Sequence, residues 1–264
     1  MAAPVLSPAK ALSPARTAES KRAGRKLAVL TAYDYPGARL LEEAGVDWIL
    51  VGDSLGMVVL GHPDTTHVTL ADMLHHTAAV ARGVARTPLI TDLPIGTYDT
   101  PRMAVDNALA LLSAGAHAVK IEGGATHCDR VEALVARGIP VMGHIGMLPQ
   151  SVLLEGGYRL KGKTQDSSDA LLDDARALAK AGVFGMVLEL VHPLAAKRIT
   201  ASVPVPTIGI GSGTECDGQV LVTHDLTGAF PWFCPRFAKP RAAVGEAVRA
   251  AASEFAAEVR GGEK

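Results

Sequence analysis

The sequence predicts a (β/α)8 barrel, an α/β fold in which eight parallel strands alternate with helices. Three observations favour it. Short, continuous apolar runs alternate with helix-like segments, and such runs are typical of parallel strands buried on both faces. Eight of these runs occur without a break in composition, in a chain of 264 residues, close to the usual barrel size of about 250. No G-x-G-x-x-G follows the first run, which makes a doubly wound dinucleotide-binding sheet the second choice.

The expected elements alternate along the chain. Strands are expected at 27–32, 47–52, 88–92, 117–122, 139–143, 184–189, 206–210 and 219–223. Helices are expected at 36–44, 70–85, 101–114, 127–137, 168–181, 193–201, 214–218 and 240–258. Thr100 before Pro101 is typical of a helix start, and Ser167 or Ser168 is the expected N-cap of the helix at 168–181. A weak repeat supports this arrangement, because AGVDWILVGD, AGAHAVKIEG and AGVFGMVLEL each run from a helix end through an apolar strand.

Residues 1–24 are expected to form a flexible, disordered leader, and residues 25–264 the barrel domain. The leader is rich in Ala, Pro and Ser and lacks the apolar segment of a secretory signal. Its composition indicates disorder, with an organelle transit peptide as the alternative.

The bulk composition excludes several classes of protein. The formal net charge of -1 favours neither a nucleic-acid partner nor a membrane surface. The apolar runs are shorter than the roughly 18–20 residues of a membrane-spanning helix. The three cysteines are odd in number and lack C-x-x-C spacing, which argues against a disulfide framework or a zinc knuckle and favours a cytoplasmic location.

Four expected strands end in an acidic residue: Asp53 after WILVG, Asp92 in PLITD, Glu122 in AVKIE and Glu189 in GMVLE. The carboxyl ends of barrel strands meet at one rim, where barrel enzymes have their active sites. Burying several like charges together is costly unless a cation or a proton offsets them. Oxygen donors favour Mg²⁺ or Mn²⁺ over Zn²⁺. Any single acid of this kind could instead cap a helix or lie in a surface loop.

Two basic side chains accompany these acids. Lys120 lies two residues before Glu122, so both side chains are expected on the same face of their strand, where Lys120 could bind a substrate carboxylate. His144 follows another strand and could bind an oxyanion or be structural. Because three carboxylates suffice for one metal, Glu189 is free to act as a base, or else is a fourth ligand.

Other polar motifs carry weaker signals. The glycine-rich IGIGSG at 208–213 could cradle a phosphate, but close packing of a turn is the favoured interpretation. The pairs His62/His67 and His75/His76 lack a convincing metal-ligand spacing and are interpreted as loop or helix-surface residues.

The chain resembles the ketopantoate hydroxymethyltransferase family over about residues 25–240. The resemblance is carried in order by LTAYDYPGARLLEEAGVDWILVGDSLGMVVLG, TPLITDLPIGTY, AVKIEGG, PVMGHIGMLPQS, GYRLKGKT, VLEL and PTIGIGSGTECDGQVLVTHDLTG. It implies a barrel enzyme that transfers a hydroxymethyl group from 5,10-methylenetetrahydrofolate to 3-methyl-2-oxobutanoate. The product would be 2-dehydropantoate, for pantothenate and coenzyme A synthesis. It also implies one Mg²⁺ per subunit and a homodecamer.

The resemblance also implies roles for individual residues. The metal positions match Asp53, Asp92 and Glu122, and the general base matches Glu189. The substrate-binding positions are Asp53, Ser54, Asp92, Lys120 and His144. The chemistry agrees, because a divalent cation can stabilise the enolate that forms when a base removes the C3 proton.

Some segments depart from the family pattern, and other functions compete with it. Leu148 stands where the family usually has Thr, His62 and His67 lie in an unusual loop, and FPWFCPRFAKP near Trp232 is atypical. The main alternative is a Mg²⁺-dependent 2-oxo acid lyase or mutase of the phosphoenolpyruvate mutase/isocitrate lyase type. The K-K-C-G-H-type loop of those enzymes is absent from the sequence. A third hypothesis is a barrel that serves as a binding or assembly protein without catalytic activity.

Overall fold

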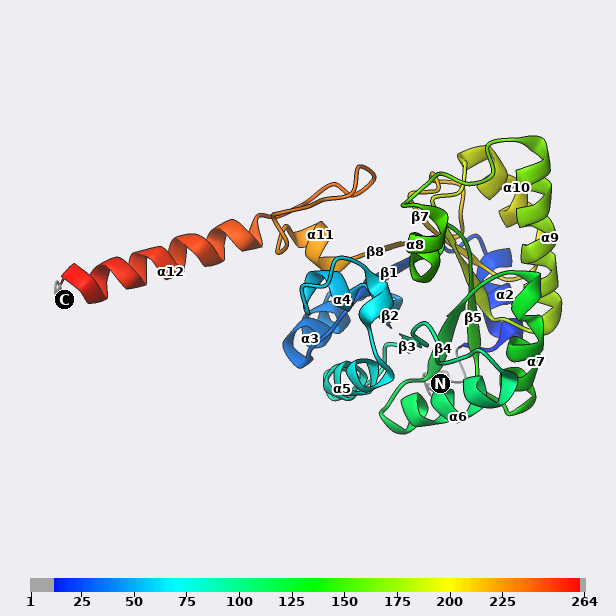
Figure 1. The fold of residues 1–264 in the computed structure, drawn as a ribbon, viewed down its shortest axis with the longest axis horizontal. Helices are drawn as coiled ribbons and strands as arrows, with labels where there is room; N and C mark the ends of the chain where they lie inside the picture. The colour runs from blue at the N-terminus through cyan, green and yellow to red at the C-terminus, as the bar shows by residue number, and fades with distance from the viewer. Residues whose placement is uncertain (1–11, 262–264) are drawn as a thin grey trace, which may run out of the picture. The chain divides into compact units, whose positions relative to one another are not determined.

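The computed structural model describes residues 12–261, and its strands close a parallel barrel in chain order (Figure 1). The strands are β1 (Leu27–Thr31), β2 (Trp48–Val51), β3 (Leu89–Asp92), β4 (Ala118–Glu122), β5 (Val141–Gly146), β6 (Gly185–Glu189), β7 (Thr207–Ile210) and β8 (Gly218–Leu221). All seven registered pairs from β1–β2 to β7–β8 are parallel. The predicted (β/α)8 barrel is therefore confirmed, with strand boundaries within two or three residues of those expected.

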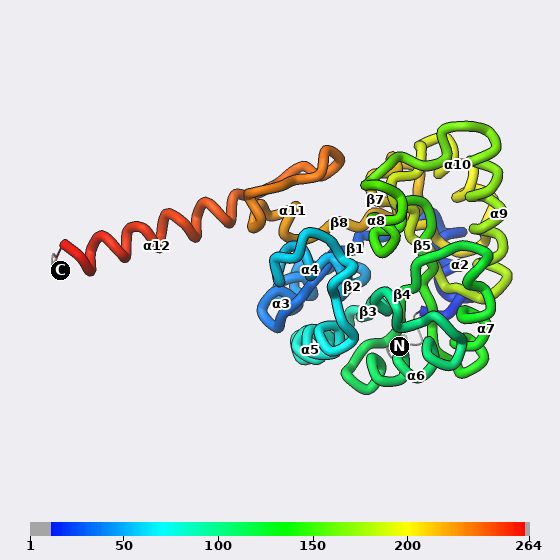
Figure 2. Tube along the Cα trace, in the orientation of Figure 1, coloured from blue at the N-terminus to red at the C-terminus, as the bar shows by residue number. Residues whose placement is uncertain are grey.

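Helices and short 3-10 turns connect the strands (Figure 2). The α-helices are α2 (Pro14–Arg22), α3 (Tyr35–Glu43), α4 (Leu55–Val58), α5 (Leu70–Ala81), α6 (Pro101–Ser113), α7 (Cys128–Ala136), α8 (Val152–Glu155), α9 (Gln165–Ala181), α10 (Pro193–Ser202), α11 (Thr223–Thr227) and α12 (Val244–Gly261). The 3-10 turns are η1 (Thr65–His67), η2 (Ala125–His127) and η3 (Pro149–Ser151). No helix of residues 12–261 is long and apolar enough to cross a membrane.

Two local predictions were wrong. The segment 214–218 is not a helix but a turn that runs into β8. Its Asp217 carboxylate accepts a hydrogen bond from the backbone N–H of Thr207 at 2.9 Å, which fixes the turn against β7. The N-cap of α9 is Thr164 rather than Ser167 or Ser168. Thr164 and Ser167 bond each other's backbone N–H in a capping box, so the helix starts earlier than expected.

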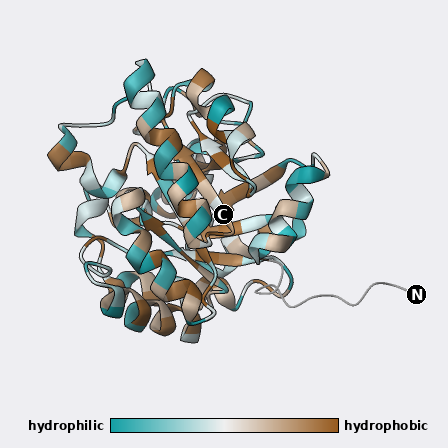
Figure 3. Cartoon of the chain, turned by 90° about the vertical axis from the view of Figure 1, so that its right-hand side faces the viewer, coloured by the Kyte–Doolittle hydropathy of each residue, from teal (hydrophilic) through white to brown (hydrophobic). Residues whose placement is uncertain are grey.

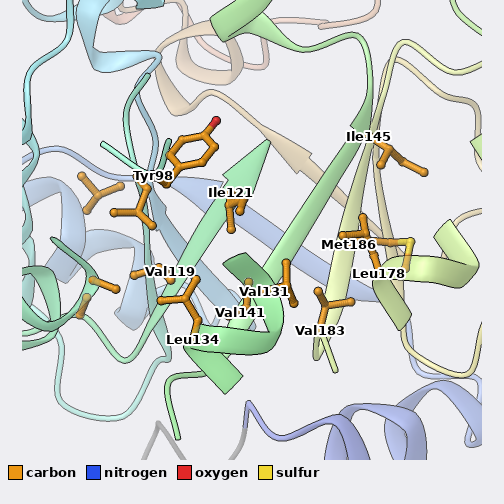
Figure 4. Close-up of a cluster of buried hydrophobic side chains, with 14 of the residues drawn as sticks. Tyr98, Val119, Ile121, Val131, Leu134, Val141, Ile145, Leu178, Val183 and Met186 are labelled. Atoms are coloured by element: carbon orange, nitrogen blue, oxygen red, sulfur yellow. The ribbon is translucent and has the colours of Figure 1, made fainter. Parts of the chain in front are cut away.

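The apolar core has two parts, one inside the barrel and one between the barrel and its helices. The inner part includes Trp48 and Phe184, whose ring centroids are 5.6 Å apart in an edge-to-face contact. The outer part buries alternate strand residues under the helices, and Figure 4 shows a portion of it around β4, β5 and β6. In Figure 3 the strands are mostly brown, the colour of hydrophobic residues, as expected for strands buried on both faces.

Helix α2 corrects the prediction of a flexible leader over residues 1–24. The Thr17 hydroxyl donates to the carbonyl of Phe184 at 2.6 Å, just before β6 begins. The Lys21 ammonium lies 3.0 Å from the Asp217 carboxylate, just before β8 begins. Leu12 is fully buried in the inner core. Residues 12–24 therefore cover the amino ends of the strands, and the prediction for residues 1–11 lies outside the described residues.

The described chain divides into two compact units after Val220. The predicted barrel domain of residues 25–264 does not coincide with this division, since the second unit starts at Leu221. That unit contains α11 and α12, and no residue of α12 is buried. The rings of Phe230 and Trp232 lie 5.2 Å apart within it.

Candidate active site

Strand register brings the predicted polar residues together at the carboxyl ends of β3, β4, β5 and β6. Asp92 pairs with Lys120, and Glu122 pairs with His144. Gly146, two residues beyond His144, pairs with Glu189. Side chains two residues apart on a strand point to the same face, so Lys120 and Glu122 lie on the same side of β4, as predicted. The expected convergence of strand-end acids is confirmed.

Lys120 lies among the carboxylates. Its Nζ atom is 3.0 Å from Asp92 Oδ1 and 3.9 Å from Glu122 Oε1, and its side chain is 5% exposed. Burial lowers the pKa of the Lys120 ammonium. The negative charges of Asp92, Glu122 and Asp53 raise that pKa by a larger amount, so the pKa of Lys120 lies above its usual value. Lys120 therefore stays protonated across the neutral pH range.

Asp53 follows β2 and lies beside Asp92. The backbone N–H of Asp53 donates to Asp92 Oδ2 at 3.1 Å. The pKa of Asp53 is raised well above its usual range by burial and by the charges of Asp92 and Glu122. Burial likewise raises the pKa of Asp92, although Lys120 opposes that rise. Two adjacent acids whose charged forms are disfavoured form a place where a cation would be stabilised.

Ser54 is the predicted substrate-side hydroxyl, and it lies at the start of α4. Its Oγ atom is 2.8 Å from the hydroxyl of Tyr33, which follows β1. A Cβ atom on the preceding Gly52 would meet Ser54 Oγ at 2.9 Å and Asp92 Oδ2 at 3.7 Å. Glycine at position 52 therefore lets the backbone pass close to the acids.

Glu122 and Glu189 lie on either side of His144. The Nδ1 atom of His144 is 3.4 Å from Glu122 Oε1, and its Nε2 atom is 3.4 Å from Glu189 Oε2. Burial and Lys120 lower the pKa of His144, but Glu122 and Glu189 raise it more, to about 9. Burial alone would raise the pKa of Glu122, but His144 and Lys120 hold it below the usual value. His144 is thus a second cation of the site at neutral pH.

Glu189 is the least buried of the four acids, with 13% of its side chain exposed. The chain turns sharply after it, because Leu190 has a φ of 46°. A left-handed conformation is unfavourable for a leucine, so surrounding contacts must impose it. The N–H of Leu190 donates to the Ile210 carbonyl, and its carbonyl accepts from Lys161 N–H at 2.7 Å. These bonds fix the carboxyl end of β6 and with it Glu189.

Gln150 and Tyr98 are site residues to which the sequence analysis assigned no role. The Gln150 side chain donates to Asp53 Oδ2 at 2.8 Å, and its backbone N–H donates to Glu122 Oε2 at 3.0 Å. The Tyr98 hydroxyl donates to Gln150 Oε1 at 2.5 Å. Both residues occur in segments that carry the family resemblance, TPLITDLPIGTY and PVMGHIGMLPQS. That placement is the one signal in the sequence that could have found them.

The site contains oxygen donors of the kind that bind divalent cations. Asp92 Oδ1 and Glu122 Oε1 are buried and accept no hydrogen bond, although Lys120 lies near both. Four carboxyl groups lie near only two basic side chains, Lys120 and His144, so the cluster has more acidic than basic groups. Among the described residues, no three His, Cys, Asp or Glu side chains are grouped closely enough to enclose a metal by themselves. Mg²⁺ does not require such a cage, because it usually retains waters and substrate oxygens as ligands.

The remaining polar motifs lie outside this cluster. In IGIGSG the Ser212 hydroxyl donates to the Leu188 carbonyl at 2.6 Å and accepts from Val191 N–H at 2.9 Å, which agrees with close packing of a turn. The rings of His62 and His67 stack with centroids 5.4 Å apart in the loop between α4 and α5.

Comparisons with known proteins relate the chain to one family. The family model described as ketopantoate hydroxymethyltransferase matches residues 12–263. A protein of Ignicoccus hospitalis named 3-methyl-2-oxobutanoate hydroxymethyltransferase is 56% identical over 241 residues, which cover 91% of each chain. A protein of the same name from Acetivibrio thermocellus is 52% identical over 246 residues, covering 92% of this chain and 87% of the other.

Solved structures show the same fold at much lower sequence identity. Phosphonopyruvate hydrolase, in a complex with oxalate and Mg²⁺, has a TM-score of 0.64 at 17% identity, covering 97% of this chain and 88% of its own. 2,3-Dimethylmalate lyase, a member of the PEP mutase/isocitrate lyase superfamily, has a TM-score of 0.62 at 20% identity, covering 98% and 90%. At these identities the likeness establishes the barrel and not the reaction. The family match over residues 12–263 and the identity of more than half to relatives across nine-tenths of the chain show that this chain belongs to the ketopantoate hydroxymethyltransferase family.

Proposed function

We propose that the protein transfers a hydroxymethyl group from 5,10-methylenetetrahydrofolate to 3-methyl-2-oxobutanoate and forms 2-dehydropantoate for pantothenate synthesis. The main observation behind the proposal is that the strand-end acids lie in two groups. Asp53, Asp92 and Glu122 surround the buried Lys120, whereas Glu189 is separated from them by His144 and is partly open to solvent. Such a site can bind an anionic 2-oxo acid at one end and remove a proton at the other.

The 2-oxo acid would bind next to Lys120. A protonated amine offers donors to a substrate carboxylate, and Lys120 retains its proton because its neighbours are acidic. Asp53, Ser54, Asp92 and His144 would complete the substrate contacts. Ser54 Oγ is held by Tyr33, and its position at the start of α4 places it at the carboxyl end of the barrel. The alternative of a binding protein without catalysis does not account for a further acid beyond those around Lys120.

Asp53, Asp92 and Glu122 would hold one Mg²⁺ per subunit. The buried Asp92 Oδ1 and Glu122 Oε1 accept no hydrogen bond among the described residues, and carboxyl groups outnumber basic side chains at the site. Both observations support this assignment. When bound, the ion would supply Lewis-acid polarisation of the substrate's keto group and so make its C3 proton more acidic. Gln150 and Lys120 would keep the carboxylates oriented, each through the contacts described above.

Glu189 would act as the general base. Its carboxylate would take the proton from C3 of the 2-oxo acid, and the electron pair of the broken C–H bond would enter the enolate. C3 would then form a bond to the one-carbon unit from the folate. One water is consumed overall, and its oxygen becomes the new hydroxyl while tetrahydrofolate leaves. His144 Nε2 lies 3.4 Å from Glu189 Oε2 and would hold the carboxylate of the base in place during the transfer.

Proton NMR in D₂O tests this function directly. Exchange of the C3 proton for deuterium collapses the methyl doublet of 3-methyl-2-oxobutanoate to a singlet. We expect this collapse with protein and Mg²⁺ alone, and a new hydroxymethyl signal once methylenetetrahydrofolate is added. Absence of both changes with folded protein and Mg²⁺ would exclude the proposed reaction. Exchange without product would show that the 2-oxo acid is a substrate but that the one-carbon donor is not the folate.

We also propose that the protein is a homo-oligomer, a decamer as in the family resemblance, and that it is cytoplasmic. Four apolar side chains of α12 are exposed at spacings that place them on one face of the helix: Val244, Val248, Phe255 and Val259. A second copy of the chain is the proposed partner for this face. The three cysteines, all unpaired, support a reducing compartment. Native mass spectrometry of wild type and Phe255→Glu tests the assembly, and a wild-type monomer at micromolar concentration would exclude it.

A further inference from the structure

Gln150 connects the ends of three strands through one side chain and one backbone N–H. Its Nε2 atom donates to Asp53 Oδ2, after β2, and to the Leu93 carbonyl at 3.0 Å, after β3. Its backbone N–H donates to Glu122 Oε2 at the end of β4. Gln150 itself comes from η3, after β5, and is 4% exposed. Gln150 therefore bonds two of the three acids that are proposed to hold the metal.

The amide of Gln150 can adopt only one of its two flipped orientations. Its Nε2 has two hydrogens, and both have acceptors, Asp53 Oδ2 and the Leu93 carbonyl. Its Oε1 accepts from the Tyr98 hydroxyl. A flipped amide would turn Oε1 toward Asp53 and Nε2 toward Tyr98. It would then leave the buried Leu93 carbonyl without a donor, and an unsatisfied buried acceptor is costly.

Tyr98 is the residue that selects this orientation. It is 7% exposed, and its hydroxyl donates to Gln150 Oε1 at 2.5 Å. Its distance to the Glu122 carbonyl is 3.4 Å, longer than the 2.5 Å to Gln150 Oε1, so its one hydrogen goes to Gln150.

We propose that Gln150 and Tyr98 are positioning residues for the cation site. Tyr98 fixes the amide of Gln150, and Gln150 fixes one oxygen of Asp53 and one of Glu122, so that their other oxygens face the metal. This inference rests on the proposed metal role of Asp53 and Glu122. Hydrogen bonds to metal-ligating carboxylates commonly change metal affinity by 10–100-fold, which sets the expected size of the effect.

Calorimetry with Mg²⁺ and electron paramagnetic resonance with Mn²⁺ on the full chain test the proposal without an activity assay. The variants are Gln150→Met, which keeps the side-chain length but has no donor, Tyr98→Phe and the double variant. Matched controls are Gln165→Met, at the exposed start of α9, and Tyr35→Phe, on the exposed side of α3. Thermal unfolding of each variant establishes that it is folded.

We expect Gln150→Met to weaken metal binding about 10–100-fold and Tyr98→Phe to weaken it less. The double variant should match Gln150→Met, because Tyr98 acts through Gln150. The controls should bind as wild type does. Wild-type affinity in a folded Gln150→Met, or independent and multiplying losses in the double variant, would overturn the proposal. If Gln150→Met does not fold, Tyr98→Phe decides, and unchanged affinity there would also overturn it. A wild-type protein that binds neither metal would remove the metal role in the proposed function, and this inference with it.

Discussion

The imidazole of His144 lies 3.4 Å from the carboxylate of Glu189, with Nε2 facing Oε2. Burial and Lys120 lower the pKa of His144, but Glu122 and Glu189 raise it more, to about 9, so Glu189 faces an imidazolium at neutral pH. The contact places a basic side chain next to the acid that is proposed as the general base.

Glu189→Gln is predicted to abolish exchange of the C3 proton, since an amide cannot accept it. Mg²⁺ binding should change by less than about threefold, a small effect on the affinity scale, because Glu189 is outside the proposed ligand set. The measurements are the D₂O exchange assay and calorimetry. Glu215→Gln is the control, since Glu215 is exposed and pairs with Lys197 on the surface. Undiminished exchange in Glu189→Gln would take the base role away from this residue.

Asp92→Asn is predicted to weaken Mg²⁺ binding at least about tenfold, or roughly 1.4 kcal/mol. An amide oxygen can still accept the N–H of Asp53, but the negative charge next to Lys120 is lost. Calorimetry measures the affinity. Asp106→Asn provides the comparison, because Asp106 is exposed on α6 and pairs only with Arg102 among the described residues. Equal affinities for Asp92→Asn and wild type would rule out Asp92 as a ligand.

Deleting residues 1–22 is predicted to lower the unfolding temperature, whereas deleting residues 1–11 should not. The longer deletion removes Leu12, the Thr17 hydrogen bond and the Lys21 ion pair from the amino end of the barrel. Leu12→Ala alone should cost about 2–5 kcal/mol, because it leaves a cavity in a closed core. Calorimetric melting of the two truncations and the point variant tests this. Equal melting temperatures for both truncations would show that α2 adds no stability.

Asp225→Asn is predicted to stabilise the protein at neutral pH. Burial raises the pKa of Asp225 to about 6, so folding favours its protonated form. The protonated Asp225 makes its full contribution to the free energy of unfolding below the unfolded-state pKa of about 4. This contribution is lost as the pH rises through about 6. The asparagine should therefore gain roughly 1–3 kcal/mol at pH 7.5 and little at pH 4. Urea unfolding at the two pH values measures the difference, and an equal change at both would contradict the assignment.

The fold and the charged centre of the site follow from short-range patterns in the sequence. Buried parallel strands leave continuous apolar runs, and the residue that ends each run must lie at the barrel rim. The two-residue spacing of Lys120 and Glu122 set their common face. Asp53, Asp92 and Glu189 were predicted on the same basis.

The residues that were missed lie where no such pattern exists. Gln150 and Tyr98 are in connections between strands and helices, and their contacts join segments about 50 residues apart. The packing of α2 was missed because its composition is polar and only Thr17 and Ala18 of the helix are buried. The helix is held by the Thr17 hydroxyl, which donates to a backbone carbonyl of the barrel, and by the Lys21 ammonium, which donates to another carbonyl and pairs with Asp217. Sequence periodicity does not report contacts of this kind.

Helix α2 covers the amino ends of the strands, and the polar cluster lies at their carboxyl ends. The contacts of α2 and the polar cluster therefore lie at opposite ends of one barrel, separated by the inner core around Trp48 and Phe184. Engineering can exploit this separation. Substitutions around Leu12 and Thr17 can be screened for a higher melting temperature with little risk to turnover. Attachment to a solid support through the amino-terminal end would leave the reactive end accessible to small substrates.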